Sequence, residues 1–284
     1  MSGFALALVL ASAFVHATWN LLAKRAGGGA VFVWLFAAIS MLLYAPIVAI
    51  VLIATDPGIG APEVGFMAGS AVLHVVYFLT LQRGYEVGDL SLVYPVARGT
   101  GPLITTAAAI VLLDERPTAL AISGTVLITV GVITLAGNLT AAREKRSAVL
   151  LALLTGVLIA CYTLWDKQAL DASRLPPILL NWGNDVGRAL YLLPVAATRG
   201  ADIRGLWKAR RREVLGVAAL SPVAYFLVLT ALTFTPASYV GPAREVGILI
   251  GAALGARVLA EADPRRRLVG AAMIVIGVIA LALG

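Results

Sequence analysis

The segment YPVARGTGP at residues 94–102 returns 146 residues later as VGPAREVGI at residues 240–248. Both copies carry proline, glycine and one arginine, Arg98 in the first and Arg244 in the second, within otherwise apolar sequence. The match extends without a gap over 85–137 and 231–283. The chain is therefore predicted to contain the same unit twice.

A second match, at an offset of 143 residues, places 16–26 over 159–169. The predicted organisation is a first repeat over 1–137, a linker over 138–147 and a second repeat over 148–284. Each repeat holds five apolar runs, and an odd number makes the second copy enter a membrane from the opposite face. Inverted repeats of this kind are frequent in secondary transporters, whose substrate site lies between the halves.

The composition argues against a soluble protein. Of 284 residues, 60% are hydrophobic and only 13% are charged, with a mean hydropathy of +0.93. Soluble domains are roughly 25% charged. We therefore expect a lipid bilayer to cover most of the surface.

The net charge of +7 and the isoelectric point near 9.9 raise the alternative of a nucleic-acid partner. The basic residues lie between apolar runs, and no nucleic-acid motif accompanies them, so no such partner is expected. The single cysteine, Cys161, lies inside an apolar run and predicts a small packing residue rather than a disulfide.

Ten apolar runs are long enough to cross a bilayer as helices. They are 3–23, 30–55, 65–85, 90–113, 119–137, 148–168, 176–197, 213–234, 237–260 and 267–284. The predicted fold class is all-α, a polytopic membrane protein with ten transmembrane helices in two inverted five-helix repeats.

The distribution of Lys and Arg predicts the orientation, because basic residues favour cytoplasmic loops. The loops after odd-numbered runs hold sixteen of them, at 24, 25, 83, 143, 145, 146, 199, 204, 208, 210, 211, 212, 257, 265, 266 and 267. The termini and the other loops hold three, Arg116, Lys167 and Arg174. Both termini are therefore expected on the outer side.

Glycines recur in the runs that consist almost wholly of small and aliphatic residues. Gly124 and Gly131 stand seven residues apart, as do Gly270 and Gly277. Small residues at this spacing let helix backbones approach closely in lipid, so we assign these glycines to packing.

Other runs carry polar and aromatic residues at helical spacing, as His16, Trp19 and Asn20 do at i, i+3 and i+4. Singly, each aromatic residue suits an interfacial belt or a core hydrogen bond. Together, and far from the run ends, they indicate an aromatic-walled cavity. The predicted lining residues are His16, Trp19, Asn20, His74, Tyr77, Phe78, Tyr94, Tyr162, Trp165, Tyr225 and Tyr239.

Five charged residues fall inside the runs, where each costs about 2.5–3.5 kcal/mol unless it is paired or hydrated. They are Arg98, Asp185, Arg188, Arg244 and Glu245. Asp185 and Arg188 are three residues apart and favour a salt bridge, and Glu245 has either arginine as a partner.

Pro95, Gly99, Gly101 and Pro102 in one repeat, and Gly241 and Pro242 in the other, predict broken helices beside Arg98 and Arg244. Breaks at matching positions of two repeats indicate a transport site. Arg98, Asp185, Arg244 and Glu245 thus complete the predicted substrate-binding residues. One arginine is expected to hold a substrate carboxylate, and the alternative is that both form internal bridges.

The motifs LDERP at 113–117 leading into Gly124–Gly131, and LAE at 259–261 leading into Gly270–Gly277, resemble the EamA-type drug/metabolite transporters over the whole chain. Within that superfamily the chain is similar to bacterial aromatic amino-acid exporters of the YddG kind. The resemblance implies a basket of ten helices in the inner membrane, a central cavity and export of amino acids or related metabolites. It also implies a structural role near helix ends for Glu115 and Glu261.

This interpretation implies transport by alternating access. The substrate carboxylate would bind an arginine, and the substrate side chain would lie against the aromatic residues. We expect a monomer that is not an enzyme and carries no metal or cofactor, since no zinc or nucleotide motif occurs. The alternative substrates are sugar phosphates, which favour more than two basic groups, and lipophilic cations, which favour an unpaired central carboxylate. Nucleotide sugars are a further competing substrate class. The alternatives outside transport are a membrane enzyme acting on lipid-linked substrates and a structural or oligomeric membrane protein, which would leave the aromatic and charged inward faces unexplained.

Overall fold

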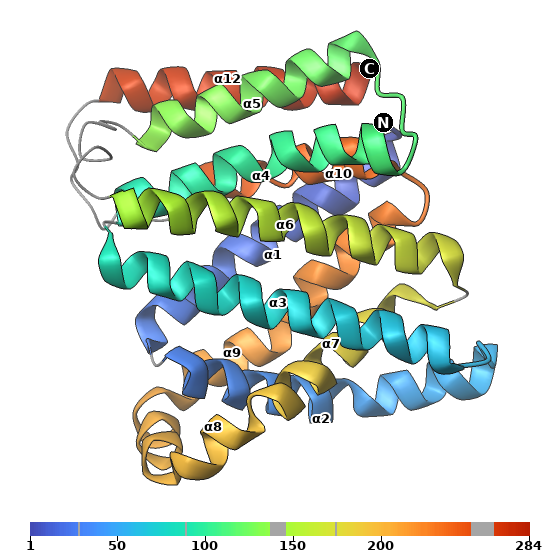
Figure 1. The fold of residues 1–284 in the computed structure, drawn as a ribbon, viewed down its shortest axis with the longest axis vertical. Helices are drawn as coiled ribbons and strands as arrows, with labels where there is room; N and C mark the ends of the chain where they lie inside the picture. The colour runs from blue at the N-terminus through green and yellow to red at the C-terminus, as the bar shows by residue number, and fades with distance from the viewer. Residues whose placement is uncertain (28, 89, 137–145, 174, 251–263) are drawn as a thin grey trace.

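The computed structural model describes residues 1–27, 29–88, 90–136, 146–173, 175–250 and 264–284, and every regular element in these ranges is a helix. The helices run side by side along one direction (Figure 1). Their bounds are α1 Gly3–Ala26, α2 Gly29–Thr55, α3 Ala61–Val87, α4 Leu90–Leu112, α5 Ala119–Ala136, α6 Arg146–Ala172, α7 Pro177–Tyr191, α8 Leu193–Thr198, α9 Gly200–Leu232, α10 Ala237–Ala243 and α12 Pro264–Leu283.

The surface of the bundle is apolar, as a lipid-embedded protein requires. Ile53 is 85% exposed, Val111 76% and Leu268 72%. A soluble protein does not leave so many large apolar side chains in water. Five helices are long and apolar enough to cross a membrane, namely α1, α2, α3, α6 and α9. Shorter apolar helices lie within α4, α5 and α12.

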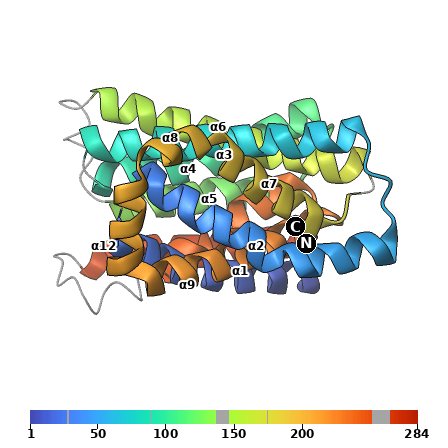
Figure 2. The same cartoon turned by 90° about the horizontal axis from the view of Figure 1, so that it is seen from below.

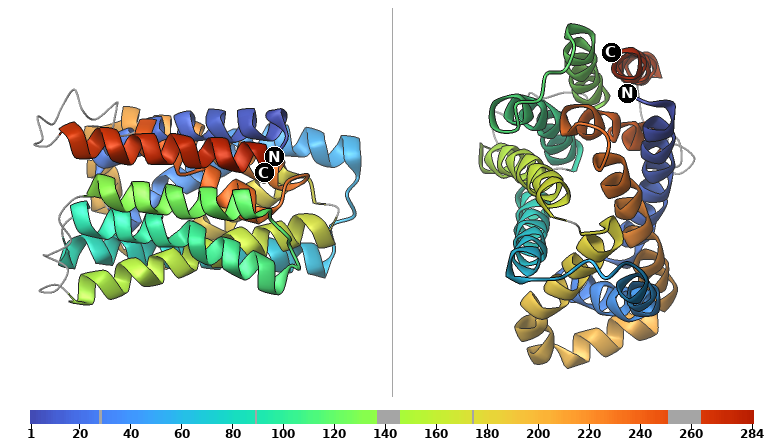
Figure 3. Two further views of the ribbon diagram at one scale, coloured as in Figure 1. Left: turned by 90° about the horizontal axis from the view of Figure 1, so that it is seen from above. Right: turned by 90° about the vertical axis from the view of Figure 1, so that its right-hand side faces the viewer.

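The helices follow one another around a ring that is visible when the bundle is viewed end-on (Figure 3, right). Contacts run from α5 through α4, α6, α3, α7, α2 and α9 to α1. The pair α5 and α12 packs at one end of this ring, and the short helix α10 contacts α4 on one side and α1 and α9 on the other. Segments from both repeats therefore surround the interior.

Glycine-to-glycine contacts hold α5 against α12. A Cβ atom added to Gly124 would lie 2.6 Å from the carbonyl oxygen of Gly277, and one added to Gly131 would lie 2.8 Å from that of Gly270. The predicted packing role of these four glycines is confirmed. Residue numbers fall along α12 as they rise along α5, since Gly124 meets Gly277 and Gly131 meets Gly270. The two repeat-related helices are therefore antiparallel.

The predicted breaks differ between the two repeats. The second occurs, because α10 ends at Ala243 and a turn at Arg244 and Glu245 follows. The first prediction is wrong, because α4 runs from Leu90 to Leu112 through both of its prolines. Transmembrane helices tolerate proline where neighbouring groups compensate for the missing backbone hydrogen bond.

The two ends of the chain lie together at one end of the bundle (Figure 2), where the Met1 amino group donates a hydrogen bond of 3.3 Å to the carbonyl of Ala282. At the opposite end, the segment that sequence analysis treats as a loop is helical. The first part of α9, up to a kink at Arg210, precedes the apolar part that continues to Leu232.

Candidate functional site

Four ring side chains meet inside the bundle, and we call them the aromatic cluster: His74 and Tyr77 on α3, Tyr162 on α6 and Tyr225 on α9. The His74 ring lies 4.3 Å from the Tyr162 ring and 5.1 Å from the Tyr225 ring, measured between centroids. Tyr77 lies 5.5 Å from Tyr162. Helices from both repeats thus bring together side chains that the sequence places far apart.

A buried polar network adjoins the aromatic cluster. The amide nitrogen of Asn184 lies 2.8 Å from Nδ1 of His74 and 3.2 Å from the hydroxyl oxygen of Ser70. Asp166 is 0% exposed, and its carboxylate accepts a hydrogen bond from the Tyr225 hydroxyl group. The network therefore links α3, α6, α7 and α9.

Sequence analysis missed Asp166, although a signal was present. Asp166 follows Tyr162 by four residues and so shares its helix face. It also lies near the expected end of a span and precedes Lys167, which made it resemble a surface charge. In the structure Lys167 pairs with Asp171 at 2.7 Å and leaves Asp166 to the interior.

Two salt bridges neutralise most of the predicted in-span charges. Arg98 Nε lies 3.0 Å from Glu245 Oε2, and both side chains are buried. Asp185 and Arg188 form the predicted pair on α7, with the carboxylate oxygen 2.5 Å from a guanidinium nitrogen. The Arg98–Glu245 pair joins the two repeats directly.

Arg244 differs from the other in-span arginines. Its Cζ atom lies 6.0 Å from the Tyr162 ring centroid and 5.7 Å from that of Tyr225, in cation–π geometry. Among the described residues it forms no salt bridge, and it is only partly buried. A charged guanidinium group is thus available at the aromatic cluster.

The other predicted residues lie elsewhere. His16 contacts Trp19 at 4.7 Å between ring centroids, and the charges of Arg98 and Arg244 act on His16. Asn20 bonds to the backbone of its own helix, and Phe78 packs with side chains of α2 and α9.

Two predicted aromatic residues face away from the cluster. Trp165 is 39% exposed and donates to the carbonyl of Phe66 at 2.9 Å. The Tyr239 hydroxyl group lies between the backbones of Thr118 and Gly284. The side chain of Tyr94 and the residues around Glu261 lie outside the described part of the chain.

Glu115 has the structural role that the family resemblance implied. Its two carboxylate oxygens accept hydrogen bonds of 2.7 and 2.9 Å from the backbone N–H groups of Ala237 and Ser238. These are the first residues of α10, whose N-terminal N–H groups have no partner within the helix. A residue of the first repeat therefore caps a helix of the second.

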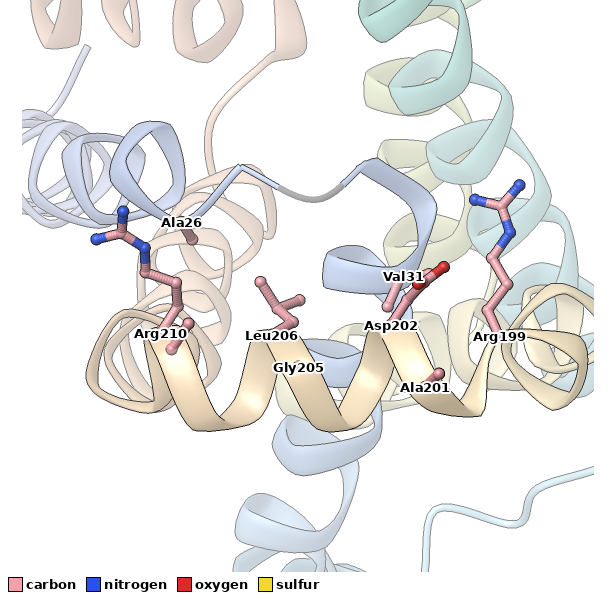
Figure 4. Close-up of a pocket in the computed structure, with 9 residues that line it drawn as sticks. Ala26, Val31, Arg199, Ala201, Asp202, Gly205, Leu206 and Arg210 are labelled. Atoms are coloured by element: carbon pink, nitrogen blue, oxygen red, sulfur yellow. The ribbon is translucent and has the colours of Figure 1, made fainter.

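A hollow of about 550 Å³ lies outside the aromatic cluster. It separates the first part of α9 from the turn between α1 and α2, and Arg199, Asp202 and Arg210 point into it (Figure 4). A smaller one of about 160 Å³ lies between α4 and α5. Within the described ranges no group of three His, Cys, Asp or Glu side chains is placed to hold a metal ion.

An apolar bundle that encloses charged and aromatic side chains is typical of multi-pass membrane proteins that act on small molecules. The model of the EamA-like transporter family matches residues 3–137 and again 146–283. The chain therefore belongs to this family, whose members are transporters rather than enzymes, and it contains the family unit as two repeats.

Comparison with solved structures supports the fold. A crystal structure described only as that of a protein superposes with a TM-score of 0.76 at 15% sequence identity, covering 100% of this chain and 98% of the other. At this identity the likeness concerns the fold alone. No curated protein matches the sequence.

Proposed function

We propose that the protein exports amino acids, aromatic and other neutral ones above all, and that Arg244 binds the substrate carboxylate. The observation that carries this proposal is the Arg244 guanidinium group, which lies over Tyr162 and Tyr225 and forms no salt bridge with the described residues. A guanidinium group matches a carboxylate with two parallel hydrogen bonds. The rings beside it offer an apolar face to the substrate side chain.

Arg98, the other candidate for this role, is less suited to it. Its guanidinium group already pairs with Glu245. A substrate that displaced Glu245 would leave a buried carboxylate unpaired. We therefore assign Arg98 to the contact between the repeats and Arg244 to the substrate.

The transport cycle that we infer is alternating access, in which two inverted repeats rock about the aromatic cluster. The antiparallel packing of α5 on α12 supports repeats of opposite orientation, because these helices correspond in the sequence. The proposed setting is the inner membrane of a bacterial cell, with both termini on the periplasmic side.

One observation favours a second candidate function, the export of lipophilic cations. Such a substrate requires a central carboxylate that is not already paired. Asp166 is fully buried, and its Oδ1 atom accepts no hydrogen bond from the described residues. Sugar phosphates are less well supported, because Arg98 and Arg188 each have a carboxylate partner.

Purified protein in liposomes, loaded with radiolabelled phenylalanine, leucine or a lipophilic cation, tests the proposal. We expect the wild type to show efflux of the amino acids and Arg244→Gln to lose it. Arg244→Lys should retain partial activity, because a single ammonium group replaces the guanidinium group and its two parallel hydrogen bonds. Arg83→Gln is the matched control, since Arg83 is exposed and pairs with Glu86.

Two results would contradict the assignment. Unchanged amino-acid efflux in Arg244→Gln would show that the guanidinium group does not hold the substrate. Efflux of the cation alone, with no amino-acid efflux from the wild type, would establish the second candidate function instead.

A further inference from the structure

Two opposite charges that lack full partners face the same tyrosine. Tyr225 donates its hydroxyl hydrogen to Asp166, and its ring lies 5.7 Å from the Arg244 guanidinium carbon. The charge of Arg244 acts on Asp166, yet the two form no salt bridge. The carboxylate and the guanidinium group thus both contact Tyr225, one at its hydroxyl group and the other near its ring.

The carboxylate of Asp166 is incompletely satisfied. By geometry no described residue donates a hydrogen bond to Oδ1, although the side chain is 0% exposed and the Ser70 hydroxyl group is near enough to interact with the carboxylate. Buried polar atoms nearly always have a partner, and an ionisable group inside a membrane protein indicates a functional site. The Ser70 hydroxyl group lies beside the same carboxylate and is itself buried.

Asp166 is present in only one of the two repeats, unlike the structural residues that recur in both. At the offset of 143 residues, Tyr162 corresponds to Trp19 and Asp166 to Ala23. The first repeat therefore has an aromatic residue at the matching position but no carboxylate. The acidic group belongs to one side of the site only, as binding of an asymmetric ligand requires.

We propose that Asp166 binds the α-ammonium group of the substrate while Arg244 binds its carboxylate, so that the site selects zwitterions. This inference rests on the proposed function and adds a second charged contact to it. An ammonium group supplies hydrogen-bond donors to Oδ1 and to the Ser70 hydroxyl oxygen. A zwitterionic substrate then pairs with both Asp166 and Arg244, whereas a plain acid or a plain amine pairs with only one of them.

Three ligands that share a phenylethyl skeleton test this selection. They are phenylalanine, 3-phenylpropionate, which lacks the ammonium group, and phenethylamine, which lacks the carboxylate. Binding to the purified full-length protein is measured by titration calorimetry. The wild type is expected to bind phenylalanine roughly 10- to 100-fold more tightly than either analogue, as follows from losing one charged hydrogen-bonded contact.

Variants then assign the two contacts. Asp166→Asn is expected to weaken phenylalanine binding by about 10-fold or more and to leave 3-phenylpropionate binding nearly unchanged. Arg244→Gln should weaken the binding of phenylalanine and of 3-phenylpropionate and leave the binding of phenethylamine nearly unchanged. Asp171→Asn is the matched control, because Asp171 lies on the same helix and faces outward to Lys167.

The outcomes separate the inference from the function on which it rests. No phenylalanine binding by the wild type would refute the proposed function. Phenylalanine binding that depends on Arg244 but not on Asp166 would overturn the present inference alone. If Asp166→Asn fails to fold, equal wild-type affinity for phenylalanine and 3-phenylpropionate overturns it without any variant.

Discussion

At the residue scale, one interior ion pair crosses from the first repeat to the second, whereas Asp185 and Arg188 pair within α7. Glu245 follows Arg244, but the matching position in the first repeat is Gly99, which provides no carboxylate. Arg98 therefore pairs with Glu245 of the other repeat. This exchange leaves Arg244 without a salt bridge to the described residues, which is why we propose it as the group that binds the substrate.

Removing one member of the buried Arg98–Glu245 pair should be more damaging than removing both. Arg98→Gln leaves the Glu245 carboxylate buried without its partner, which costs about 3–5 kcal/mol, whereas Arg98→Gln/Glu245→Gln removes both charges. Thermal unfolding in detergent is expected to show a lower Tm for the single variant and a partial return for the double variant. Additive losses of Tm would contradict a direct pairing.

The cap provided by Glu115 makes a separate prediction. Glu115→Ala removes two hydrogen bonds from the N-terminus of α10 and should lower the free energy of unfolding by about 1–3 kcal/mol. Glu86→Ala removes an equally acidic residue from an exposed pair and should change it by less than about 1 kcal/mol. Equal Tm values for the two variants would argue against the cap.

At the scale of single elements, the glycines of α12 set how closely the two terminal helices approach. A side chain at Gly277 would collide with the backbone of Gly124 and with Ile128. Such a collision cannot be relieved by a rotamer change, because one of the contacting atoms belongs to the backbone. The α5–α12 pair must separate or the substitution must destabilise the protein.

Gly277→Leu should therefore reduce the amount of folded protein recovered from membranes and lower its Tm, since overpacking costs about 1–3 kcal/mol or more. Gly65→Leu in α3 is the control, because nothing lies within 4 Å of a Cβ atom at that position. Fluorescence-detected size-exclusion chromatography compares the two. Equal monodisperse peaks and equal Tm values would show that the contact carries little stability.

At the scale of the whole molecule, the position of the basic segments predicts its orientation in the membrane. With Cys161→Ser as background, Gly205→Cys in α9 and Ile59→Cys between α2 and α3 place single thiols at opposite ends of the bundle. A membrane-impermeant maleimide should label Ile59→Cys in intact cells and Gly205→Cys only in inverted vesicles. The reverse pattern would place both termini in the cytoplasm.

Much of the helical architecture could be predicted from sequence, because long apolar runs must form helices in lipid. The long spans correspond to α1, α2, α3, α6 and α9. The break in α4 was wrongly predicted because proline alone does not end a transmembrane helix that is packed among other helices. The helical first part of α9 was missed because charged residues resemble a loop.

The site was only partly predictable, because residues far apart in sequence meet through helix rotation. Trp165 and Asp166 are adjacent, and successive residues on a helix point about 100° apart. Only one of them can face the interior, and hydropathy favoured the tryptophan. Asp185 and Arg188, in contrast, lie three residues apart on one helix, so their salt bridge could be predicted from the sequence.

The hydrogen bond between Met1 and Ala282 has a consequence for how the gene could be rearranged. A circular permutant that starts at residue 146, passes from 284 to 1 through a short Gly/Ser linker and stops at 136 should keep the same helix contacts, because the joined ends are already neighbours. It would synthesise the more basic half first. It would also move both ends of the polypeptide to the other face of the bilayer, turning a protein whose ends are expected outside into one that can be fused to cytoplasmic partners.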